Sequence, residues 1–174
     1  MSDAILALDI ATRMGVAEGA PGETPNIFCI DFGSRGGLAA ERGLGVAEIF
    51  ANAVRWATRV FSEHPPKLVV LEGMIPKYDK TVQCGLWAII SGIATLNNVP
   101  FEVAPIQTWR AFVLGNGRMP KREAKTRAIQ VCTQLGWAVH NDDEAEAAMI
   151  WLWACAQEAP RLAPKIPLFM RGAA

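Results

Sequence analysis

Two short apolar runs that each end in a carboxylate constrain the fold most. Residues Ile5–Leu8 precede Asp9, and residues Leu68–Leu71 precede Glu72. A run of this length and character is typical of a strand buried on both faces of a sheet. If the two strands are neighbours, their acids meet at one edge, where they repel unless a proton or a cation is shared. The alternative is that each acid only begins a turn.

The rest of the chain predicts one α/β domain. Turn residues after residue 19 and the apolar segment 26–32 indicate two strands that return on the first as an antiparallel meander. Apolar residues at helical spacing, with proline and glycine between the segments, predict the later elements. Helices are expected over residues 44–61, 82–96, 105–114, 121–135 and 141–154, and strands over residues 68–72 and 100–104.

Composition narrows the class of protein. A chain of 174 residues with 51% hydrophobic and 20% charged residues fits one globular domain with a sizeable core. No apolar stretch is long enough to span a bilayer, and Met1–Asp3 lacks the basic start of a signal peptide, so we expect no membrane partner. The four cysteines form no Cys-x-x-Cys pair, which predicts small buried hydrophobes in a reducing cytoplasm rather than a zinc site or disulfides.

Charge is distributed unevenly although the formal net charge is zero. Residues 110–127 hold six basic residues and only Glu123 as an acid, whereas residues 141–158 hold five acids and no base. A metal-dependent enzyme that acts on a polyanion needs such neighbouring blocks, because cations hold phosphates while carboxylates hold metal. Two solvated helix faces of opposite sign are the alternative.

Within the acidic block, Asp143 and Glu146 are three residues apart and share a helix face with Ile150 and Trp153. This face points to the core, so its acids need a partner, and a metal held by the two strand-end acids would provide one. His140, in the preceding loop, is a candidate auxiliary base, although a loop histidine is more often incidental.

The basic block contains Gly115-Asn116-Gly117, whose amides could approach a phosphate. No strand precedes these glycines and no Gly-Lys-Ser/Thr follows, which argues against a nucleotide P-loop. Lys121 and Lys125 lie four residues apart, on one face of the next predicted helix, and this face can meet a nucleic-acid backbone.

In order and spacing, these residues resemble the RuvC branch of the RNase H-like nucleases. The resemblance runs from Ala4 to Ala156 and implies an RNase H-like mixed five-stranded sheet, three antiparallel strands then two parallel, flanked by helices. The nuclease domain would cover residues 1–158, and residues 159–174 would form a basic tail. The positions that carry the resemblance are Leu8-Asp9, Leu71-Glu72, Arg110 with Gly115-Asn116-Gly117 and Lys121, and residues 143–147.

Three positions depart from the family pattern. Ile10-Ala11-Thr12 stands where the family usually has Asp-Pro-Gly, Glu146 where it has Asp, and Arg110 where it has Lys. The family also places an aromatic residue after its glutamate that wedges into a junction, and Tyr78 is the candidate here.

The resemblance implies a homodimeric resolvase that cuts four-way (Holliday) DNA junctions by paired nicks. Asp9 would bridge two Mg²⁺ ions about 4 Å apart, for which Mn²⁺ would substitute, and Glu72, Asp143 and Glu146 would complete their shells. One ion would activate the attacking water and the other would stabilise the departing 3′ oxygen. The residues expected to contact DNA are Arg13, Lys77, Tyr78, Lys80, Arg110, Arg118, Lys121, Arg122 and Lys125.

Two other classes of function stay open at this point. Sugar kinases and actin-type ATPases share the fold, but they need two such domains and this chain holds one. A non-catalytic module that binds branched DNA would also fit, given the unusual Ile10-Ala11 turn and Glu146. Metal-dependent nicking of a four-way junction separates these readings.

Overall fold

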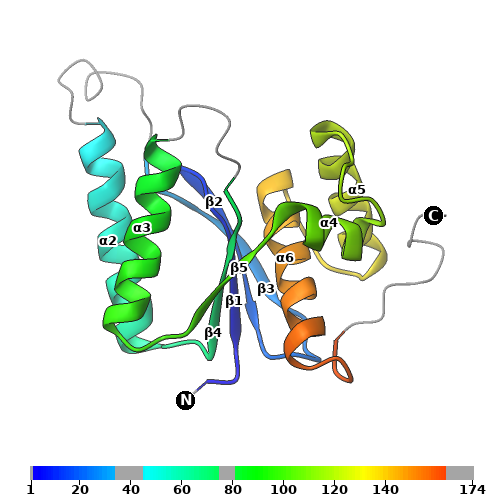
Figure 1. The fold of residues 1–174 in the computed structure, drawn as a ribbon, viewed down its shortest axis with the longest axis horizontal. Coiled ribbons are helices and arrows are strands. Elements are labelled where there is room, and N and C mark those ends of the chain that lie inside the picture. Colours follow the sequence, from blue (N-terminus) through cyan, green and yellow to red (C-terminus); the bar gives the residue numbers. More distant parts are fainter. Residues whose placement is uncertain (1, 34–44, 75–80, 164–174) are drawn as a thin grey trace.

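A computed structural model of the chain describes residues 2–33, 45–74 and 81–163, which form a five-stranded sheet with helices on both faces (Figure 1). The spatial order of the strands is β3-β2-β1-β4-β5, with β3, β2 and β1 antiparallel and β1, β4 and β5 parallel. The predicted mixed sheet is therefore confirmed. The strands are β1 (Ile5–Asp9), β2 (Arg13–Gly19), β3 (Asn26–Asp31), β4 (Leu68–Glu72) and β5 (Phe101–Ala104).

Within the described residues, five helices cover the sheet, two on one face and three on the other (Figure 1). The first pair is α2 (Gly45–Glu63) and α3 (Thr81–Leu96). The second group is α4 (Ile106–Leu114), α5 (Lys121–Gln134) and α6 (Asp142–Glu158). The predicted helices are confirmed, but α6 continues for four residues beyond the predicted end, since Cys155 still packs in the core.

Alternation along β1 divides the interior into two cores. Ile5 and Ala7 pack with α4, α5 and α6, whereas Leu6 and Leu8 pack with α2 and α3. Along β4 the residues alternate in the same way, with Leu68 and Val70 on the α6 side and Val69 and Leu71 on the other. Continuing the alternation by one residue places Asp9 and Glu72 on the α6 face.

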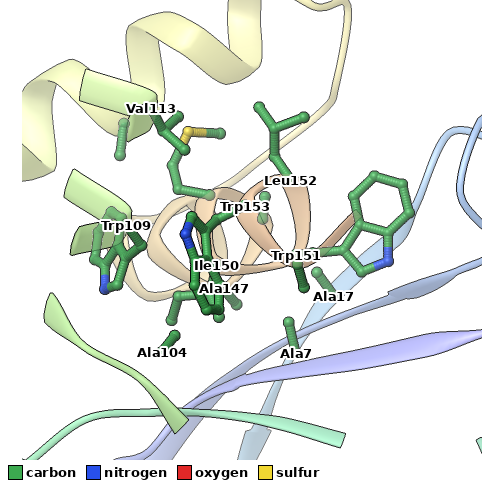
Figure 2. Packing of buried hydrophobic residues seen from close by; sticks show 14 of the residues in the cluster. Ala7, Ala17, Ala104, Trp109, Val113, Ala147, Ile150, Trp151, Leu152 and Trp153 are labelled. Atoms are coloured by element: carbon green, nitrogen blue, oxygen red, sulfur yellow. The ribbon is translucent and has the colours of Figure 1, made fainter. Parts of the chain in front are cut away.

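Small residues let α6 lie close against the sheet. Ala7, Ala17 and Ala147 are fully buried between the helix and the strands (Figure 2). Gly15 of β2 is the tightest point, because a Cβ atom there would overlap the backbone carbonyl of Asp143. At the other end of the contact, the indole of Trp151 donates a hydrogen bond of 3.2 Å to the carbonyl of Gly19. The close approach therefore fixes the position of Asp143.

All four cysteines lie in the described part of the chain and are free thiols. Cys132 and Cys155 are buried, as predicted, whereas Cys29 is only half-buried and Cys84 is exposed. The prediction was wrong for Cys84 because this residue lies on the outward side of α3. None of the helices described combines the length and apolar character needed to cross a membrane.

Gly15→Ala is expected to lower the free energy of unfolding by about 1–3 kcal/mol, because its methyl group must push the first turn of α6 away from β2. Gly19→Ala on the same strand is the control, since its Cβ would stay 3.3 Å or more from every neighbour. Urea unfolding of both variants measures the difference. Equal stability of the two variants would contradict the close approach.

Candidate active site

Asp9 and Glu72 lie side by side at the carboxyl ends of β1 and β4. The two strands are parallel neighbours, with Leu8 opposite Leu71, so the next residue of each strand is an acid at the same level. Only 8% of Asp9 and 9% of Glu72 is exposed. The sheet therefore holds two carboxylates together in a largely dry setting.

The first turns of α6 add two more carboxylates. Asn141 caps this helix by accepting a hydrogen bond of 2.9 Å from the backbone N–H of Glu144, so the helix begins at Asp142. That start turns Asp143 and Glu146 toward the sheet, where Glu146 is buried and Asp143 is half-buried. The inward face predicted for this pair is the one observed.

The four carboxylates line one cavity of about 430 Å³. Arg110, Lys121 and Lys125 from α4 and α5 also line it, as does the turn at residues 10–12. Gln83 of α3 closes another side and donates a hydrogen bond of 2.9 Å to the carbonyl of Ile10, which fixes this turn. The acidic and basic blocks of the sequence thus meet at a single site.

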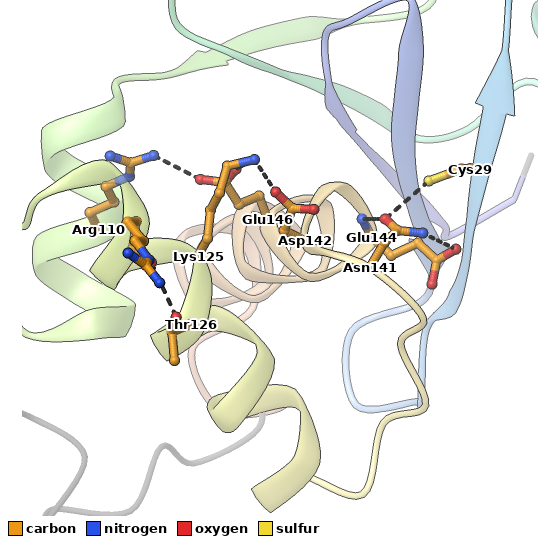
Figure 3. A network of polar contacts seen from close by, with 9 residues as sticks. Cys29, Arg110, Lys125, Thr126, Asn141, Asp142, Glu144 and Glu146 are labelled. Carbon is orange, nitrogen blue, oxygen red and sulfur yellow. Dashed lines mark hydrogen bonds and ion pairs between the residues drawn. The ribbon is translucent and has the colours of Figure 1, made fainter.

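Two cations already contact the acids of α6 (Figure 3). Nη2 of Arg110 lies 2.7 Å from Oε1 of Glu146 in a largely buried ion pair. Nζ of Lys125 forms an ion pair with Asp142 and lies 3.8 Å from Oε2 of Glu146. Each carboxylate oxygen of Glu146 therefore faces one cation, which ties α4 and α5 to α6.

The two strand-end acids have strongly perturbed protonation. Burial raises the pKa of Asp9 well above its usual value, and repulsion by Glu72, Glu146 and Asp143 raises it further. Burial, followed by the charge of Glu146, raises the pKa of Glu72 to about 7. Both shifts mean that the ionised pair is costly unless a cation neutralises it.

The first two acids of α6 differ from each other in protonation. Burial, with some repulsion from Asp142, raises the pKa of Asp143. The hydrogen bond from Lys125 lowers the pKa of Asp142. Burial disfavours the charge of Lys125, but its interactions with Asp142 and Glu146 outweigh this and raise the pKa of the lysine. Charge is thus compensated at the rim of the cavity and not at its centre.

Hard cations such as Mg²⁺ take oxygen ligands, and the cavity offers four carboxylates. Oε1 of Glu72 is buried and has no hydrogen-bond partner in the part of the chain that the structure describes, so this carboxylate has acceptor capacity that the protein leaves unused. Within residues 2–33, 45–74 and 81–163, however, no three carboxylate, imidazole or thiol side chains are already arranged around a metal position. The donor set fits a divalent ion, and the ligands would draw together around it.

The predicted DNA-contacting residues are spread more widely. Lys121, Lys125 and Arg110 line the cavity, whereas Arg118 and Arg122 are exposed on the same side of the sheet without lining it. Arg13 is exposed at the start of β2, where its interaction with the Cys29 thiol raises its pKa. Three predicted contacts lie outside the described residues: Lys77, Tyr78 and Lys80.

The glycines of the Gly115-Asn116-Gly117 loop have structural roles. Gly115 ends α4 in a left-handed conformation, with φ of 84°. Gly117 lies against the backbone of Gln107, where a Cβ atom would overlap the carbonyl oxygen. Helix termination and close packing are sufficient to explain both glycines.

Sequence reasoning missed Gln83 and Trp109, which lie next to the site without belonging to an acidic or basic motif. Its proposal for His140 finds little support in the geometry. The His140 imidazole lies 3.1 Å from the buried Glu144, which also accepts hydrogen bonds from the backbone of His140 and the side chain of Asn141. This group serves the cap of α6 and does not line the cavity.

Comparison with solved structures identifies the fold. Thermus thermophilus RuvC is 15% identical, with a TM-score of 0.65 over 93% of this chain and 99% of that one. The chain therefore has a RuvC-like fold. The same enzyme in complex with a Holliday junction substrate gives a TM-score of 0.66, and the fowlpox virus Holliday junction resolvase, 14% identical, gives 0.54 over 88% of this chain and 99% of that one. Comparison of the sequence with protein-family models and with curated proteins gave no match.

The RuvC-like fold confirms the RNase H-like architecture expected from the sequence. Because the identities are low, the likeness concerns the fold. The function rests on the cavity and its side chains.

Asp9→Asn is expected to stabilise the metal-free protein at pH 8 by on the order of 2 kcal/mol. Carboxyls whose pKa is raised by folding lose their protons first in the unfolded chain, so the free energy of unfolding falls as pH rises from about 4.5 to 7. The side-chain amide of the Asp9→Asn variant does not ionise, so the variant avoids the cost of a charged group at this buried position. Urea unfolding in EDTA at pH 5 and pH 8 measures the difference in stability between variant and wild type, which should be larger at pH 8. An equal difference at both pH values would show that neither burial nor repulsion raises the pKa of Asp9.

Proposed function

We propose that this chain is a metal-dependent, structure-selective endonuclease that hydrolyses DNA phosphodiester bonds at four-way junctions. The observation that carries the proposal is the single cavity in which four carboxylates meet Arg110, Lys121 and Lys125. The carboxylates suit Mg²⁺, with Mn²⁺ as a substitute, and the cations suit phosphate. The RuvC-like fold, whose solved examples include junction resolvases, makes branched DNA the substrate to test.

Asp9 would be the central ligand of the proposed metal site. It is the carboxylate whose pKa is raised by all three of the others, after burial, which marks it as the centre of the acidic group. Glu72, Asp143 and Glu146 would complete the ligand set from β4 and α6. The bound ions would activate the attacking water and stabilise the departing 3′ oxygen.

The protein's own cations would hold the substrate. Lys121 is exposed at the start of α5 and lines the cavity, so it is free to approach a phosphate. Arg118 and Arg122 extend the basic surface beside it. Phosphate contacts of this kind position the DNA without reading its sequence, so the choice of junction would come from shape.

Asp9→Asn should retain junction binding and lose at least about 100-fold in cleavage rate, because the central metal ligand is removed while the basic surface is unchanged. Nicking of a synthetic four-way junction with Mg²⁺, beside a linear duplex of the same sequence, measures the loss. Asp3→Asn, an exposed acid before the opposite end of β1, is the matched control and should cut normally. Near wild-type cutting by Asp9→Asn would refute the assignment, and junction binding without any cutting by the wild type would favour a non-catalytic binding module.

A homodimer would supply the two active sites that paired nicks require. An apolar groove of about 640 Å³ runs between α2 and α3 on their outer side, where Val54, Ile89, Ile93 and Leu96 meet. Leu96 is 82% exposed. A second copy of this chain is the occupant that would bury both grooves at once, as a two-fold interface does.

Leu96→Glu should weaken the dimer at least about 10-fold, because the new carboxylate would have to be buried in an apolar contact. Sedimentation equilibrium of the full chain measures the dissociation constant. Leu162→Glu is the control, since Leu162 is 60% exposed beyond the end of α6 and away from the groove. A dimer unaffected by Leu96→Glu would place the interface elsewhere.

A further inference from the structure

Three buried polar atoms around Glu72 have no hydrogen-bond partner in the part of the chain that the structure describes. They are Oε1 of Glu72, Nε1 of Trp109 and Nε of Arg110. Buried polar atoms are nearly always paired, and leaving one unpaired costs about 1–3 kcal/mol. One acceptor and two donors therefore lack partners, and Glu72 and Arg110, which carry two of these atoms, line the cavity.

The backbone brings Trp109 to Glu72. Glu72 lies opposite Ala104 across the β4–β5 ladder, and the backbone N–H of Gly73 donates to the Ala104 carbonyl at 2.8 Å. The chain then turns into α4 at Pro105, whose carbonyl accepts a hydrogen bond of 3.1 Å from the backbone N–H of Trp109. Trp109 thus stands one helical turn after Pro105, the residue that follows Ala104. The nearby indole of Trp109 lowers the pKa of Glu72, whereas burial and the charge of Glu146 raise it.

Arg110, the next residue of α4, already binds another carboxylate of this site. Arg110 donates from Nη2 to Oε1 of Glu146 at 2.7 Å. Its guanidinium carbon lies 5.2 Å from the centre of the Trp109 ring, so the two side chains are stacked. Successive residues of α4 therefore face two different carboxylates, Glu72 and Glu146.

We propose that Trp109 is a positioning residue for Glu72, its indole N–H donating to Oε1 of the ionised carboxylate while the other oxygen holds metal. This inference rests on the metal site of the proposed function. Carboxylates that bind metal are themselves held by hydrogen bonds from neighbouring groups, and loss of such a partner typically costs 10–100-fold in metal affinity. The indole N–H of Trp109 would then have a hydrogen-bond acceptor, which it lacks among the described residues.

A purely structural role for Trp109 makes a different prediction. Trp109 is fully buried in the cluster beneath α6 (Figure 2), and packing alone needs its rings but not its N–H. Trp151 is the matched comparison, because it is fully buried in the same cluster and its indole N–H bonds to Gly19, at the other end of α6. Phenylalanine at either position removes one N–H and part of the ring system.

The experiment compares Mn²⁺ affinity by electron paramagnetic resonance titration of the full chain. Trp109→Phe is expected to bind Mn²⁺ 10–100-fold more weakly than wild type, and Trp151→Phe to bind it as wild type does, although both variants lose stability. Equal affinity of Trp109→Phe and wild type would overturn the positioning role. Absence of Mn²⁺ binding by the wild type would instead overturn the metal site and the proposed function with it.

A second measurement uses the wild-type protein, in case Trp109→Phe does not fold. The indole N–H signal of Trp109 in a ¹⁵N–¹H spectrum should move downfield as Mg²⁺ is added, because its hydrogen bond to an ionised carboxylate forms then. The indole signal of Trp151 should stay in place. A Trp109 signal that does not move while Mg²⁺ saturates the site would refute the inference.

Discussion

The burial of Asp9 beside Glu72 is the constraint around which the site is built. Two like charges at the ends of adjacent buried strands repel in a medium that screens them poorly. The protein's own cations relieve this only in part. The charge of Arg110 favours the ionised form of Glu72, but within the described residues the ion pairs near the cavity involve Asp142 and Glu146 and not the strand-end acids. The proposed divalent ion would supply the missing positive charge, and the stability lost at the buried acids is the expected cost of keeping them at a functional site.

The position of the other two ligands depends on backbone contact rather than on charge. Gly15, Ala7 and Ala17 have no side chain or a small one, so α6 packs close to the sheet at these positions. The first turn of the helix therefore reaches the ends of β1 and β4. The Asn141 cap then fixes which residues of that turn point inward. The carboxylates are therefore held by regular elements and not by loops, which suits chemistry that requires fixed distances.

Patterns within single segments made the sheet and the acids at its edge predictable. Apolar runs locate strands, and alternation and helical spacing locate the faces of Asp9 and Asp143. The contacts between segments far apart in sequence were not predictable in this way. Arg110 and Lys125 were assigned to phosphate by their charge, but their distances to Glu146 and Asp142 depend on how α4 and α5 pack on α6. No sequence motif marks Trp109, because only the fold shows which group lies beside its N–H.

Glu146 and Arg110, two of the positions that depart from the pattern of the resembled family, form an ion pair with each other. The resemblance leads one to expect Asp and Lys where this chain has Glu146 and Arg110. The longer Glu146 side chain places its carboxylate between α4 and α5, where Arg110 and Lys125 each face one oxygen. A guanidinium keeps its charge when buried and donates in fixed directions, so it suits this largely dry position better than an ammonium group would. Glu146 and Arg110 thus act together in one largely buried ion pair, and loss of either partner would leave the other charge buried and unpaired.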